Sequence, residues 1–236
     1  MRLYKKIVSN LILIVSIILF TLSFNKQLSF SAFMDFVIFV DAGHGGKDNG
    51  ASYLDIYEDE INYQIASKLY DICIEKNIIT YITRSGDYDL ASQYAKNRKK
   101  EDLYKRSENI NNSNCDCFIS FHVNQYYEEY VNGPMVYFES DSDNSFRLAK
   151  NIQNELNLLT ANEKVVHKEN FYLFKKCNPP GVLIECGFIS NDEERYKLLD
   201  SDYQLSIAQA VYNGIYKYYL GEWLLKKFYR WLNNNI

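Results

Sequence analysis

The chain contains few of the residues that interrupt regular structure or form cross-links. Only three prolines occur in 236 residues, and the absence of internal repeats or low-complexity tracts excludes a proline-rich or repetitive architecture. Five cysteines cannot all pair, and their irregular spacing is unlike a small disulfide-stapled domain, so most are expected to be buried thiols. A zinc site built on Cys115 and Cys117 is not expected, because a single residue separates them, whereas about two to four residues usually separate paired zinc-binding cysteines.

An excess of positive charge is also missing. The formal net charge is -4 and the sequence pI is near 5.5, which removes the general electrostatic argument for nucleic acid as a partner. With 47% hydrophobic and 24% charged residues, the chain has the composition of one ordinary globular domain with a sizeable core.

The sequence begins with a basic segment followed by an apolar one. Arg2, Lys5 and Lys6 precede an almost uninterrupted apolar stretch at 7–24. This pattern is typical of an export signal, and the stretch also approaches the ~20 residues that span a bilayer. We therefore expect residues 1–32 to be an export signal or a membrane anchor with its spacer, and the protein to act outside the cytoplasmic membrane. The pattern leaves both cleavage and retention of the segment open.

Between residues 33 and 220, apolar runs rich in β-branched and aromatic residues alternate with helical patterns. Strands are predicted at 36–41, 78–83, 117–122, 135–139 and 182–186, and helices at 60–76, 102–112, 144–158 and 202–220. The alternation predicts a single α/β domain whose twisted sheet is mostly parallel or mixed and carries helices on both faces.

Two of the three histidines stand at the ends of predicted strands. His44 follows the run at 36–41 in a glycine-rich turn, and His122 ends the run at 117–122. Open α/β folds place their chemistry at the edge of the sheet where strands end. The third, His167, lies in a charged stretch without such a context and is expected at the surface.

Glutamate is the residue type that completes a known zinc set with two histidines. Zinc in hydrolases is commonly held by three side chains, and His, His and Glu is one established combination. Among three consecutive acids, Glu58 is the predicted ligand because it lies just before a helix, in a loop able to fold back over His44. Asp59 and Glu60 fall at the helix start, where unpaired amides and the helix dipole stabilise an acid. The sequence therefore predicts a Zn²⁺ site of His44, Glu58 and His122.

Glu185 stands inside one of the most apolar strands of the chain. A carboxylate there is costly unless it is paired or takes part in chemistry. Beside a zinc site it can act as a general acid/base, which takes a proton from water and returns it to a leaving amine. The alternative is a structural carboxylate paired with Arg84 or Arg106.

Several separated motifs, in this order, resemble the zinc-dependent N-acetylmuramoyl-L-alanine amidases of bacterial cell walls. The resemblance covers roughly residues 37–220. It rests on VDAGHGG at 40–46, Glu58 before a helix, Thr83-Arg84, Arg106 with Ile110-Asn111, ISFHVN at 119–124 and LIECGFISN at 183–191. It implies zinc on His44, Glu58 and His122, Glu185 as the catalytic acid/base, and peptidoglycan as the substrate. The departures from the family pattern, Ala42 and Cys186, fall on none of these residues.

Within the family, the stretch at 99–106 and the lack of a wall-binding repeat resemble the spore-cortex amidases. Those enzymes cleave the amide between N-acetylmuramic acid and L-alanine, after which the muramic-δ-lactam recognised during germination is formed. Two other functions stay open: a catalytically silent wall-binding or scaffold protein, and a metallopeptidase that cuts within the stem peptide. Some family members depend on an activating partner protein, and this sequence identifies none.

Residues 221–236 extend beyond the usual end of the family and contain both tryptophans. At ~100° per residue, the aliphatic and aromatic side chains gather on one arc and Lys226, Lys227 and Arg230 on the other. The pattern predicts an amphipathic C-terminal helix. It fits a helix that lies on a membrane surface or binds a partner, and equally a final helix packed on the domain.

Overall fold

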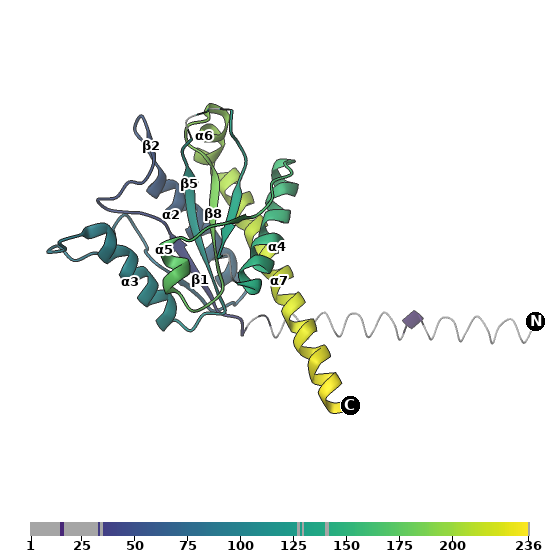
Figure 1. The fold of residues 1–236 in the computed structure, drawn as a ribbon. Coiled ribbons are helices and arrows are strands. Elements are labelled where there is room, and N and C mark those ends of the chain that lie inside the picture. The colour runs from purple at the N-terminus through teal and green to yellow at the C-terminus, as the bar shows by residue number, and fades with distance from the viewer. Residues whose placement is uncertain are drawn as a thin grey trace, which may run out of the picture.

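The computed structural model describes residues 15–16, 33, 35–126, 128, 130–139 and 142–235, which are arranged around one twisted sheet (Figure 1). The six strands follow the order β4-β1-β5-β8-β6-β7. Their bounds are β1 Ile38–Ala42, β4 Thr80–Ile82, β5 Cys117–Asn124, β6 Met135–Phe138, β7 His167–Lys168 and β8 Gly181–Phe188. The first four in spatial order are parallel, whereas β6 runs antiparallel to β8. The predicted mixed, mostly parallel sheet is confirmed.

Helices cover both faces of this sheet, as the sequence predicts. One face carries α2 (Glu58–Glu75), α4 (Asp143–Thr160) and α7 (Ser201–Asn235), and α3 (Arg98–Asn112) and α5 (Tyr172–Lys176) lie on the other. Strand residues alternate between the two layers: Ile38 and Val40 pack toward α2 and α7, while Phe39 packs with the α3 and α5 layer. His122 and Glu185 share the face of Phe39 by the same alternation, so the chemistry lies on the α3 side.

Several element boundaries differ from the sequence prediction. Helix α2 begins at Glu58, two residues before the predicted start at 60, so Glu58 belongs to the first helical turn rather than to the preceding loop. Helix α3 begins at Arg98 instead of 102, because the Asn97 side chain accepts a hydrogen bond from the Lys100 amide and caps the helix. The sequence analysis did not predict α5, α6 (Asp192–Leu199), β7 or the small ribbon of β2 (Ser52–Tyr53) and β3 (Ile56–Tyr57).

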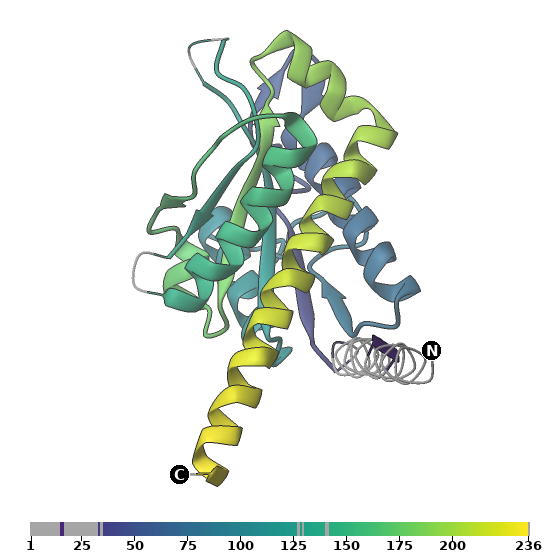
Figure 2. The same ribbon diagram turned by 90° about the vertical axis from the view of Figure 1, so that its right-hand side faces the viewer.

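Helix α7 is continuous from Ser201 to Asn235 and therefore includes both the helix predicted at 202–220 and the predicted C-terminal helix. Its first half lies along α2 and α4, and its last turns project beyond the rest of the fold (Figure 2). Phe33, just before β1, packs its ring against Tyr216 and Tyr219 of this helix.

The predicted export or anchor segment at 1–32 lies outside the described residues, apart from Val15 and Ser16. In the part of the chain that the structure describes, no helix combines the length and apolar character that a membrane crossing requires.

Candidate metal centre

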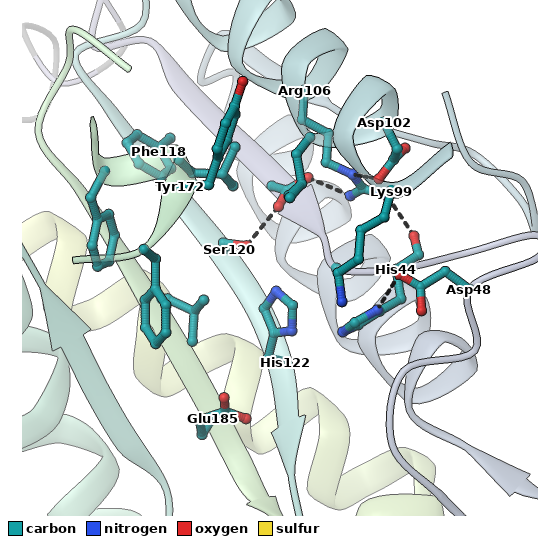
Figure 3. Close-up of a pocket in the computed structure, with 17 residues that line it drawn as sticks. His44, Asp48, Lys99, Asp102, Arg106, Phe118, Ser120, His122, Tyr172 and Glu185 are labelled. Atoms are coloured by element: carbon teal, nitrogen blue, oxygen red, sulfur yellow. Dashed lines mark hydrogen bonds and ion pairs between the residues drawn. The ribbon is translucent and has the colours of Figure 1, made fainter. Parts of the chain in front are cut away.

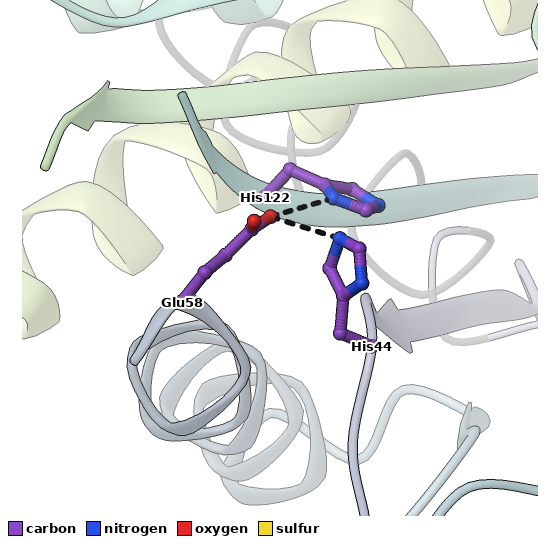
Figure 4. A group of neighbouring side chains, drawn as sticks. All are labelled: His44, Glu58 and His122. Atoms are coloured by element: carbon purple, nitrogen blue, oxygen red, sulfur yellow. Dashed lines mark hydrogen bonds and ion pairs between the residues drawn. The ribbon is translucent and has the colours of Figure 1, made fainter. Parts of the chain in front are cut away.

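Three side chains from separate elements meet near the sheet edge (Figure 4). His44 follows β1, Glu58 opens α2, and His122 belongs to β5. One possible ligand atom from each lies within 4.8 Å of those of the other two. Glu58 Oε1 is 2.9 Å from His122 Nδ1 and 3.3 Å from His44 Nε2. The group offers two imidazole nitrogens and a carboxylate oxygen, a donor set that can hold a metal ion.

Backbone and side-chain donors hold the Glu58 carboxylate in place. The Ala51 amide donates to Oε2 at 2.6 Å, while the Val123 amide and the Asn62 side chain donate to Oε1 at 3.1 and 3.2 Å. Burial opposes the charged form, but the bonds and charges of both imidazoles outweigh it, so the pKa of Glu58 lies well below its usual value. Glu58 is therefore an ionised, fixed ligand candidate at neutral pH.

The loop after β1 has an unusual backbone that aims His44 at this point. His44 itself has a φ of 59°, and Gly45 and Gly46 follow with φ of 125° and 63°. Asp48 Oδ2 lies 3.0 Å from His44 Nδ1 and orients the ring from its other side. A Cβ at Gly43 would lie 2.4 Å from His122 Cε1, so glycine at that position allows the two imidazole rings to approach to 4.9 Å between centroids.

A buried arginine fixes this loop to the sheet and to α3. Arg106 is 1% exposed and donates to Asp41 Oδ1 at 2.8 Å, to Asp102 Oδ2 at 2.7 Å and to the carbonyls of Ala42 and His44 at 2.6 and 2.5 Å. Burial opposes ionisation of Asp41, but Arg106 and two hydroxyl donors outweigh it and hold the pKa of Asp41 below its usual value.

Glu185 lies beside His122, because the two residues are in register on the neighbouring strands β8 and β5. Its Oε2 is buried and has no hydrogen-bond partner among the described residues. Burial, reinforced by the charge of Glu58 and opposed by the two imidazoles, raises the pKa of Glu185 to about 7. Glu185 is not paired with Arg84 or Arg106, the alternative that the sequence left open. Arg106 donates to Asp41 and Asp102, and Arg84 donates to backbone carbonyls, among them those of Gly43 and Asp59.

The two histidines and Glu185 lie at one cavity of about 220 Å³ (Figure 3). His44, His122 and Glu185 line one part of it, and the opposite part is an apolar wall from α5 and its neighbours. The wall includes Phe118, Phe171, Tyr172, Leu173, Phe174 and Leu183. A cavity with a few convergent polar groups and an apolar wall is typical of an active site.

The remaining candidates of the sequence analysis lie elsewhere. Cys115 and Cys117 belong to different hydrophobic clusters on opposite faces of the sheet, and all five cysteines are free thiols. His167 lies on the short strand β7, its ring 5.5 Å from that of Tyr137, outside the group formed by His44, Glu58 and His122.

Comparison with known proteins identifies the family. A family profile described as N-acetylmuramoyl-L-alanine amidase matches residues 38–217. The chain belongs to this family. The germination-specific N-acetylmuramoyl-L-alanine amidase of Bacillus subtilis is 34% identical over 188 residues, which cover 78% of this chain and 79% of that protein. The enzyme described here is thus an N-acetylmuramoyl-L-alanine amidase of peptidoglycan and acts in the cell envelope.

Solved structures of the amidase family have the same fold. The CwlD amidase from Clostridioides difficile, in complex with the GerS lipoprotein, has a TM-score of 0.75 and 36% identity, and the match covers 78% of this chain and 98% of that one. The catalytic domain of CwlV from Bacillus (Paenibacillus) polymyxa has a TM-score of 0.69 and 28% identity, with 78% and 97% covered. The α/β fold and the amidase identification therefore agree.

Sequence reasoning did not identify three features of this amidase's site. Asp48 stands four residues after His44, a spacing that gives no signal in an irregular loop. Asp41 was part of a motif but was interpreted only as a strand residue. The aromatic wall around α5 comes from a helix of five residues, which is too short for a periodic pattern.

The Asp41–Arg106 pair predicts a pH-dependent stability. The pKa of Asp41 is lower in the folded chain than in the unfolded chain, where it is near 4. Ionised Asp41 therefore stabilises the fold at pH values above its unfolded pKa, and this contribution is lost as the pH falls through its folded pKa. We expect Asp41→Asn to lower the free energy of unfolding at pH 7 by on the order of 3 kcal/mol, because Arg106 loses a buried partner, and by less at pH 3. Urea unfolding at both pH values measures this difference.

The control for this prediction is Asp55→Asn, at an exposed turn, which should change stability by at most about 0.5 kcal/mol. An equal loss for Asp41→Asn at both pH values would contradict the proposed ionic contribution.

Proposed function

We propose that this amidase is a zinc enzyme of spore-cortex maturation. In this proposal it removes the stem peptide by hydrolysing the lactyl amide between N-acetylmuramic acid and L-alanine, and its product is the precursor of muramic-δ-lactam. The observation that carries the chemical part is the convergence of His44, Glu58 and His122 beside a cavity that His44 and His122 line together with Glu185, whose Oε2 has no hydrogen-bond partner among the described residues.

His44, Glu58 and His122 would hold the zinc ion. Two imidazoles and one carboxylate form a set that catalytic zinc sites use, and two of the three ligands are oriented by further contacts: His44 by Asp48, and Glu58 by the Val123 amide and the Asn62 side chain. A bound zinc ion would supply a Lewis acid that polarises the scissile carbonyl and favours ionisation of water.

Glu185 would move the proton in this reaction. As a carboxylate it accepts a proton from the attacking water, whose oxygen forms a bond to the lactyl carbonyl carbon. The carbon–nitrogen bond then breaks, and Glu185 returns the proton to the amine of L-alanine. A pKa raised to about 7 suits both halves of this cycle, because the group can gain and lose the proton near neutral pH.

Support for the spore-cortex role comes from the similarity to the germination-specific amidase of Bacillus subtilis and to CwlD of Clostridioides difficile. The latter was solved with the GerS lipoprotein, so we include an accessory lipoprotein as the candidate partner of this chain. The mass of the released peptide distinguishes cleavage of the lactyl amide from a cut within the stem peptide.

Metal content tests the proposed ligands. His44→Ala, Glu58→Ala and His122→Ala should each lose most of the bound zinc and the activity, because two remaining ligands hold the ion weakly. His167→Ala is the matched control, since it removes the third histidine of the chain and should keep a full equivalent of zinc. Elemental analysis of the purified proteins measures this; full zinc in any of the three variants excludes that residue as a ligand.

The second prediction concerns Glu185. Glu185→Gln should keep zinc and fold but lose activity by roughly a hundredfold or more, because an amide cannot accept the proton. Glu163→Gln, an exposed carboxylate in a loop, is the control. Mass analysis of digested peptidoglycan should show peptides that begin with L-alanine; products cut within the stem would assign the enzyme as a peptidase, and a near-normal rate for Glu185→Gln would remove its role.

The third prediction concerns export, which we propose from the basic and apolar segment at 1–32. A chain that starts at Phe33 should hydrolyse soluble wall fragments when purified, because the described fold begins at this residue, but it should stay inside the cell and leave the wall unmodified. Fractionation with muropeptide analysis tests this, and normal wall modification by the shortened chain would contradict it.

A further inference from the structure

The last turns of α7 present an apolar surface that the catalytic fold does not cover. We define the distal arc as five side chains that are 40–61% exposed: Leu224, Leu225, Phe228, Tyr229 and Trp231. Within it, the ring of Phe228 stacks on that of Trp231 at 6.5 Å between centroids. The family match ends at residue 217, so the arc lies beyond the part that the amidase family shares.

The other side of the same turns faces the body of the protein. Glu222 forms an ion pair of 2.6 Å with Arg147 of α4, and Trp223 packs against the main hydrophobic cluster. The helix is therefore held by this side. The residues of the distal arc, one, two, five, six and eight positions after Trp223, lie on the other side of the helix. The sequence allowed either a helix packed on the domain or an exposed amphipathic helix. Trp223 packs on the domain, whereas Phe228 lies in the exposed arc.

Basic side chains flank the arc. Lys226 and Lys227 lie in these turns, and the Lys227 ammonium lies 4.6 Å from the centre of the Trp223 ring. Glu222, the acidic residue between 221 and 236, is already paired, so the projecting end is basic although the whole chain carries a net charge of -4. An aromatic and aliphatic arc bordered by lysines matches an anionic lipid surface better than an interface between protein copies, where lysine is depleted.

The path of the chain places this surface close to the start of the catalytic domain. Phe33 packs between Tyr216 and Tyr219 of α7, one to two turns before the distal arc. In the sequence, the apolar stretch at 7–24 ends nine residues before Phe33. Phe33, the residue at which the described fold begins, thus lies beside the part of α7 that leads into the distal arc, while His44 follows the opposite end of β1.

We propose that the distal arc of α7 lies in the interfacial region of an anionic lipid bilayer, with Lys226 and Lys227 toward the headgroups. The domain then stands on the membrane by the end opposite its metal centre, so the cavity faces the peptidoglycan. This inference concerns placement and does not depend on the amidase chemistry proposed above.

The chain itself carries the probe for a test, because both of its tryptophans lie in this segment. The full-length protein is reconstituted into vesicles of phosphatidylcholine and phosphatidylglycerol, with or without brominated acyl chains, which quench tryptophan on contact. The Trp223→Phe variant reports Trp231 alone, and we expect brominated lipid to remove about half or more of its emission. The Trp231→Phe variant reports Trp223, which packs on the body and should be much less quenched.

A further variant tests the electrostatic part. Lys226→Glu with Lys227→Glu, made in the Trp223→Phe background, should reduce the quenching of Trp231, and high salt should do the same to the unmodified background. Hydrolysis of soluble wall fragments should be unchanged in all these variants, which verifies that each is folded. The proposal is overturned if the protein does not float with the vesicles, or if Trp231 is quenched no more than Trp223. A blue-shifted Trp231 that brominated lipid does not quench would identify a second protein copy as the occupant and also overturn it.

Discussion

A single buried guanidinium ties together the parts of the fold that carry chemistry. Arg106 comes from α3, yet its donors reach the side chain of Asp41 on β1 and the carbonyls of Ala42 and His44. These contacts hold the last residues of β1 and the following loop in one geometry. A buried charge requires this many partners, because an unpaired one costs several kcal/mol. Losing any of them would therefore loosen the position of His44.

Hydrogen bonds also explain why Glu58 is suited to its proposed role. Its carboxylate accepts hydrogen bonds from two backbone amides and from the Asn62 side chain, and it faces both imidazoles. Glu185 is the contrast: it lies next to His122 in register, but its Oε2 has no partner among the described residues. One carboxylate is held ionised by donors and the other has its pKa raised by burial, which is how neighbouring acids acquire different roles.

The elements that carry the proposed ligands were predictable because each has a strong local signal. The apolar β-branched runs of β1 and β8 placed His44 after a strand and Glu185 within one, as the structure has them. The prediction that His122 ends its strand was wrong by two residues, because β5 continues to Asn124. The start of α2 was missed by two residues, because no side-chain cap precedes it: Tyr57 at the N-cap makes no such bond. The bond from Arg106 to Asp41 joins residues 65 positions apart, and no local pattern can reveal it. The short helix α5 forms the apolar wall through tertiary packing on Phe118, which overrides its weak local preference.

The central claim is that His44, Glu58 and His122 hold a zinc ion in the cavity that Glu185 faces. X-ray absorption at the zinc edge of the purified enzyme tests this most directly, because it distinguishes ligand atoms by type and distance. The account predicts nitrogen and oxygen neighbours at about 2.0–2.2 Å with the scattering pattern of two imidazoles, reduced to one imidazole in any zinc that His122→Ala retains. Sulfur neighbours at about 2.3 Å, which would indicate cysteine ligands, or an unchanged spectrum in His122→Ala, would contradict it.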